Sequence, residues 1–115
     1  MEQDTSFSKF GKSFQEDLCH MILNDRPFAD QMFEVLDINF LELKHLRVFI
    51  QKIQDYRKRY GVHPTSKIML SVIRTGLDSE PESVKTRIRD YYARVLANGQ
   101  EPDAVEYIKD TALDF

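Results

Sequence analysis

The sequence predicts an all-α domain of about five to six helices. Apolar side chains recur every three to four residues through most of the chain, the spacing that gathers them on one face of a helix. The four glycines and four prolines fall between these periodic segments, where they start or end helices. No segment alternates apolar and polar residues convincingly, or gathers enough β-branched residues, to indicate a strand.

The first helix is predicted to begin at Ser13, because Ser13 and Glu16 form the capping-box pattern in which the two side chains bond each other's backbone amides. Pro27 favours the first turn of a second, shorter helix that ends near Leu36. Residues 37–40 are predicted to form a turn.

The longest helix is expected over residues 43–60, with Gly61 as the residue of positive φ that ends it. Thr65 is placed to cap the next helix, which stops near Gly76. Three positions later a second capping-box pattern, Ser79 to Glu82, predicts a helix that continues to residue 97.

Glu101-Pro102-Asp103 indicates the start of a last helix, which carries an apolar stripe. This helix runs to Phe115 without a stop signal, so we expect it to continue in a longer protein. We interpret residues 1–98 as a globular subdomain and 99–115 as the truncated start of a helical hairpin or linker helix. The side chains predicted to mediate self-association there are Val105, Ile108, Ala112, Leu113 and Phe115.

Composition points to a globular cytoplasmic protein. Apolar residues make up 42% of the chain and charged residues 30%, a balance that disordered segments lack. Cys19 is the only cysteine, so no internal disulfide can form, and a reducing compartment is expected. The chain contains neither a signal peptide pattern nor eighteen consecutive apolar residues, and we therefore expect no membrane span.

Charge is distributed unevenly along the chain. Residues 1–40 carry three basic and eight acidic side chains, whereas residues 41–60 carry six basic and two acidic ones. Residues 84–97 are again basic and residues 98–115 are acidic. Such segregation suits self-association or a charged protein partner. The basic residues proposed to form a partner surface are Lys52, Lys58, Arg59, Lys85, Arg89 and Arg94.

No catalytic motif stands out in the sequence. The sequence Gly11-Lys12-Ser13 is similar to the end of a P-loop, but no glycine lies five residues earlier and no strand is predicted before it. Cys19 and His20 are neighbours in the sequence, but on a helix their side chains would point about 100° apart. The sequence contains no set of metal-ligating residues at the short, defined spacings of a metal site. We therefore expect no enzyme activity, metal or cofactor in this chain, with Cys19 in the core and His20 on the surface.

The order of these elements resembles the N-terminal domain of DnaB-type replicative DNA helicases, in a phage-like variant. The resemblance is carried by residues 14–28 (FQEDLCHMILNDRPF), 37–40 (DINF) and 46–65, which end in Gly-Val-His-Pro-Thr. In that family a first helix ends in an Asn/Asp-containing turn, a second leads to a Phe-bearing turn, and a Pro-Thr connector follows a long helix. The similarity spans approximately residues 8–115.

The resemblance implies a non-catalytic collar domain that helps to form a hexameric ring and binds a DnaG-type primase or a helicase loader. ATP and Mg would then belong to a RecA-like motor elsewhere in the full-length helicase. We expect little or no direct DNA binding by this domain. With the hairpin cut short, we expect the fragment to be a monomer or a weak dimer.

A small helix-turn-helix-like DNA-binding regulator is the alternative. Residues 66–75 and 80–97 could supply its two helices, with Lys85, Arg87, Arg89 and Arg94 on the second one. A recognition helix presents its first turn to the bases, however, and here that turn holds Glu80 and Glu82, which DNA phosphates would repel.

Overall fold

A computed structural model describes residues 7–96 and 104–114. Most of these residues are helical, and there is no strand among them. Six α-helices follow one another in this described part: α1 (Lys12–Asn24), α2 (Arg26–Val35), α3 (Lys44–Tyr60), α4 (Ser66–Thr75), α5 (Glu82–Tyr91) and α6 (Val105–Asp114). Short 3₁₀ turns precede α1 and α3, η1 (Phe7–Phe10) and η2 (Ile38–Phe40), and a π-helical turn, η3 (Tyr92–Leu96), extends α5. The all-α prediction is thus confirmed.

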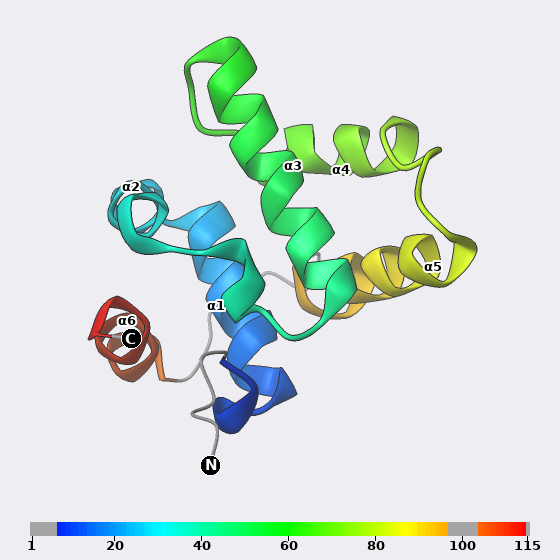
Figure 1. Cartoon of the computed structure of the whole chain (residues 1–115). Helices are drawn as coiled ribbons and strands as arrows, with labels where there is room; N and C mark the ends of the chain where they lie inside the picture. Colours follow the sequence, from blue (N-terminus) through cyan, green and yellow to red (C-terminus); the bar gives the residue numbers. More distant parts are fainter. Residues whose placement is uncertain (1–6, 97–103, 115) are drawn as a thin grey trace.

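The helices α1 and α3 form the centre of the molecule. Figure 1 shows α2 and α6 on one side of this pair and α4 and α5 on the other. The fully buried side chains Leu18, Ile22, Phe49 and Ile53 come from α1 and α3, so the core lies where these two helices pack. Burying each such side chain contributes roughly 1.5–3 kcal/mol of favourable transfer free energy.

Several helix ends follow the predicted local chemistry. Gly61 adopts φ 73° and ends α3, and its amide donates to the carbonyl of Arg57. The Thr65 hydroxyl accepts from the amide of Ile68 at 3.1 Å and caps α4. Pro27 lies in the first turn of α2, as predicted, and the side chain of Asp25, which was not predicted as a cap, accepts from the amide of Phe28 there. These ends depend on neighbours within four residues, and for that reason sequence patterns predict them well.

Both capping-box predictions are wrong. The helix α1 begins at Lys12 after Gly11, and α5 begins at Glu82 after Pro81, and neither start has a side-chain cap. Glu16 is 5% exposed and bonds a distant arginine instead of the start of its own helix. A tertiary partner has therefore replaced the local one.

Phe7 is a core residue that the sequence analysis did not identify. It is fully buried in η1, and its ring lies 5.9 Å from Phe14 and 5.8 Å from Phe40, the latter in an edge-to-face arrangement. Together with Phe10 these rings close the end of the core beside α1. A four-residue turn is too short to show helical periodicity, which explains why the sequence pattern gave no sign of it.

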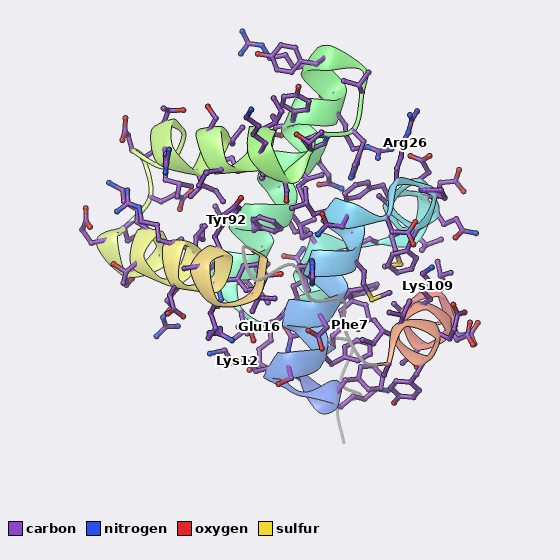
Figure 2. All side chains as sticks on the ribbon, turned by 180° about the vertical axis from the view of Figure 1, so that it is seen from behind. Phe7, Lys12, Glu16, Arg26, Tyr92 and Lys109 are labelled. Carbon is purple, nitrogen blue, oxygen red and sulfur yellow. The ribbon has the colours of Figure 1, made fainter. Side chains whose placement is uncertain are left out.

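The last helix, α6, packs across α1 and α2 and is part of the same core. Ile108 and Ala112 are each 3% exposed, and Val105 and Leu113 are half-buried against the core cluster. Lys109 forms an ion pair with Asp25 at 2.8 Å, and its ammonium lies over the Phe28 ring. Figure 2 shows Lys109 directed from α6 toward α2.

This packing limits which of the side chains predicted to mediate self-association are available for it. Ile108 and Ala112 are covered by the chain's own α1 and α2, so neither is a free self-association contact, and Val105 and Leu113 are only partly available. Phe115 and the predicted boundary between residues 98 and 99 lie outside the described residues.

Candidate interaction surfaces

The predicted basic residues do not form one surface. Lys58 and Arg59 are exposed at the free end of α3, while Lys52 is half-buried farther back on that helix. Arg89 is exposed on α5, and Lys85 of the same helix lies 3.4 Å from Glu82. Arg94 of η3 is paired with Glu16. Lys58 and Arg59 on α3 thus lie apart from the basic residues of α5 and η3.

Arg94 holds the end of α5 to α1. Its two terminal nitrogens donate to the two carboxylate oxygens of Glu16, at 3.2 and 2.5 Å. The Tyr91 hydroxyl donates to the Glu16 backbone carbonyl at 2.7 Å. The carboxylate raises the pKa of Arg94 above its ordinary value, and burial raises that of Tyr91. Figure 2 shows Glu16 on α1 facing this end of α5. Arg94 therefore holds the fold together and is not a free basic contact.

His45 is a buried histidine beside this pair. It is 4% exposed, its ring packs near Tyr91, and its Nδ1 atom has no hydrogen-bond partner among the described residues. Burial lowers the pKa of His45 below its ordinary value of 6.5. The charge of Glu16 opposes this shift, whereas Lys12, Arg87 and Arg94 add to it. His45 is consequently neutral in the folded protein at pH 7.

The stability of the domain is expected to fall on acidification because of His45. The unfolded chain takes up a proton at His45 near pH 6.5, whereas the folded chain takes it up only at lower pH. The free energy of unfolding is therefore highest above pH 6.5. Below pH 6.5 it falls, by up to about 1.4 kcal/mol per pH unit, because the unfolded chain then binds a proton that the folded chain does not. Urea denaturation between about pH 7.5 and 5.5 measures the decline.

His45→Leu supplies the comparison for this prediction. The variant loses the buried Nδ1, so it is expected to be more stable than the wild type by roughly 1 kcal/mol and to respond less to pH. His20 and His63 remain in both proteins and provide the common background. An unchanged pH response in His45→Leu would mean that other groups cause the decline.

The free end of α3, residues 56–62, is the most prominent exposed feature, and we call it the α3 tip. Tyr60 is 57% exposed and Val62 53% exposed. The Tyr56 and Tyr60 rings contact each other in a tilted arrangement, with 4.6 Å between their centroids, and the Arg59 guanidinium lies over the Tyr60 ring. Figure 1 shows this end of α3 projecting beyond the other helices. Exposed Tyr and Arg side chains are typical of protein-binding hot spots.

The α3 tip is held firmly on the inner side. The guanidinium of Arg57 donates to Asp30 at 2.6 Å and to His63 Nδ1 at 2.8 Å. Because Nδ1 accepts from an arginine, the proton of His63 is on Nε2, which donates to the Leu23 carbonyl at 2.7 Å. The Arg57 guanidinium also covers the Phe33 ring, and it lowers the pKa of Asp30. These contacts fix the tip to α1 and α2.

A shallow pocket lies beside these anchoring contacts. It has a volume of about 340 Å³ and is lined by residues of the α1–α2 turn and of the connector before α4, among them Arg26, His63 and Thr65. Figure 2 shows Arg26 at the edge of α2 that faces this connector. Sequence reasoning missed Arg57 and His63 as anchors, because their partners lie 27 and 40 residues away along the chain.

The exposed face of α6 is acidic. Glu106, Asp110 and Asp114 are spaced four residues apart and are exposed, and Tyr107 beside them is 60% exposed. The Tyr107 ring lies nearly perpendicular to the Phe14 ring, with 6.4 Å between their centroids. Residues four apart lie along one side of a helix, so these carboxylates form a single stripe.

Charge is unevenly distributed among the described helices. The helices α2 and α6 together carry two basic and five acidic side chains, whereas α4, α5 and η3 carry six basic and two acidic ones. The connection 76–81 adds two further acidic residues, and α3 itself carries six basic side chains against one acidic. Because α2 and α6 lie opposite α4 and α5 (Figure 1), the side formed by α2 and α6 carries a net negative charge. The basic excess lies mainly on α3, and more weakly on the side formed by α4 and α5.

The geometry of α4 and α5 differs from that of a helix-turn-helix. The Tyr92 hydroxyl, just after α5, donates to the carbonyl of Ser66 at the start of α4, at 3.2 Å. The end of α5 thus lies near the start of α4, and Figure 1 shows the two helices running in opposite directions. A helix-turn-helix crosses its helices at about 90–120° over a turn of about three to four residues. This arrangement therefore does not favour the DNA-binding alternative.

Cys19 is a core residue, as predicted, and burial raises the pKa of its thiol far above the ordinary value. His20 is also buried, contrary to expectation. Within the residues that the structure describes, no three potential ligand side chains cluster in a way that could hold a metal ion, and no helix is long and apolar enough to cross a membrane.

Comparison with known proteins gives no relative to guide the assignment: no protein-family model, curated protein or solved structure matches this chain.

Proposed function

We propose that this chain is a non-catalytic assembly and protein-interaction domain of a DnaB-type replicative DNA helicase. The observation that carries the proposal is the separation of charge between the acidic side, α2 and α6, and the basic side, α3 to α5. Complementary charges on opposite sides of one molecule attract further copies and orient them. The resemblance of residues 8–115 to the helicase collar supplies the biological setting.

In this proposal the domain acts in the cytoplasm through its surfaces. Its partners are its neighbours in the ring and a DnaG-type primase or loader, and the helicase is of a phage-like variant. ATP and Mg are used by a RecA-like motor domain of the same longer polypeptide. The rigid anchoring of the α3 tip by Arg57 and His63 supports this role, because a preorganised surface loses little conformational entropy on binding.

Binding to the cognate primase tests the proposal. Isothermal titration of this chain with the DnaG-type primase encoded in the same genome is expected to show binding that weakens as salt is added, since surface charges contribute to it. A duplex DNA titration run in parallel should show no comparable affinity at low salt.

The gene offers an independent test. Downstream of codon 115 it is expected to encode a strand followed by a P-loop, the start of the motor. A chain without such a motor that also binds neither the primase nor a DnaB-type helicase would overturn the proposal.

A further inference from the structure

We propose that the α3 tip of one copy docks on the acidic face of α6 of a second copy, giving a head-to-tail contact between neighbouring domains. The inference rests on the proposed assembly function and adds the surface through which copies meet. The two parts are the α3 tip, residues 56–62, and the α6 stripe formed by Glu106, Asp110 and Asp114.

Charge complementarity identifies the occupant as a second copy. Lys58 and Arg59 are exposed and have no acidic partner among the described residues. Glu106, Asp110 and Asp114 are likewise exposed and without a basic partner there. The α3 tip therefore presents unpaired positive charges, and the α6 stripe presents unpaired negative charges. Opposite charges of this kind steer and orient association.

Apolar contacts can accompany the charges on both surfaces. Tyr60 and Val62 on the tip and Tyr107 on α6 are each more than half exposed. Large aromatic side chains beside charged ones supply the desolvated centre that a specific contact needs. Both surfaces are also held in place, the tip by Arg57 and α6 by the Lys109–Asp25 ion pair. Their association therefore costs little conformational entropy.

The contact has to form between chains. In both views α2 lies between the α3 tip and α6, so the two surfaces of one chain do not meet. A tip that binds the α6 of a neighbour leaves the neighbour's tip free for a third copy. Such heterologous contacts generate rings where the rotation closes, and open chains where it does not.

Charge reversal in a mixing experiment tests this contact. One variant carries Lys58→Glu and Arg59→Glu, and the other carries Glu106→Lys and Asp110→Lys. Each variant alone places like charges at the contact, so its association constant at low salt, measured by sedimentation equilibrium at high protein concentration, is expected to fall at least about tenfold. An equimolar mixture pairs acidic tips with basic α6 faces and basic tips with acidic ones, and association should return.

Two matched variants control for net charge. Lys67→Glu with Arg74→Glu on α4 makes the same change as the tip variant, and Asp78→Lys with Glu80→Lys makes the same change as the α6 variant, both away from the proposed contact. They carry the general effect of net charge without touching the contact, so at the same salt concentration the tip and α6 variants are expected to lose at least about fivefold more of the association constant than these controls do.

The outcomes separate this contact from the wider function. If the wild type associates and neither reversal weakens it, or if the mixture fails to restore association, the contact between tip and α6 is wrong while the assembly function stands. If the wild type remains monomeric under all conditions, the contact is also wrong, and primase binding then decides the proposed function. Loss in each variant and recovery in the mixture would support the contact.

Discussion

Replacing Arg94 with alanine is expected to destabilise the domain by about 3 kcal/mol. The substitution leaves the Glu16 carboxylate, whose side chain is 6% exposed, without the guanidinium that bonds both of its oxygens. Removing one partner of a buried ion pair costs roughly 3–5 kcal/mol, and the lower end applies here because 47% of the Arg94 side chain is exposed to water. Urea denaturation monitored by circular dichroism measures the loss.

Arg89→Ala is the matched control for this prediction. Arg89 is an exposed arginine on α5, and its removal is expected to change stability by less than about 0.5 kcal/mol. Replacing both Glu16 and Arg94 by leucine should recover most of the lost stability, because no unpaired charge remains buried. Equal effects for Arg94→Ala and Arg89→Ala would show that Arg94 does not hold α5 to α1.

Ile108→Ala is expected to destabilise the folded domain by about 2–4 kcal/mol, since Ile108 is 3% exposed where α6 packs on α1 and α2. The cost combines the lost transfer free energy of the side chain with the cavity left among its neighbours. Thermal or urea unfolding at several protein concentrations measures it, and the loss should not depend on concentration.

That concentration test distinguishes a core residue from a self-association contact. If Ile108 served mainly to join two copies, the variant would change the oligomeric state and leave the stability of the monomer almost unaltered. Glu106→Ala provides the control on the exposed face of the same helix and is expected to leave stability within about 0.5 kcal/mol of the wild type.

Both predictions concern the attachment of the chain's last helices to its first. Arg94 joins η3 to α1, and Lys109 joins α6 to the turn between α1 and α2. Asp25 caps α2 with one carboxylate oxygen and binds Lys109 with the other, and the lysine lowers the pKa of this carboxyl group. The attachment of α6 keeps its acidic stripe in a fixed position on the surface, as the proposed contact between copies requires.

The surfaces proposed for binding were only partly predictable. The cluster Arg57-Lys58-Arg59 identifies a basic segment in the sequence, but only the structure shows that Arg57 faces inward to Asp30 while the next two residues face solvent. The acidic stripe of α6 can be read from its four-residue spacing. The burial of the opposite face of α6 and the ion pair between Arg94 and Glu16 could not be read in this way. Both depend on residues far away in the chain.

Local patterns were enough to predict the helices, their order and several of their ends, because periodicity, Gly61 and the Thr65 cap act over a few neighbouring residues. The tertiary structure alone decided which charged side chains are free and what covers α6. Burial and ion pairing join residues that are tens of positions apart, and a local pattern cannot specify which of several possible partners lies nearest in space. Glu16 illustrates the difference, since its local pattern predicts a helix cap and its burial makes it the partner of Arg94.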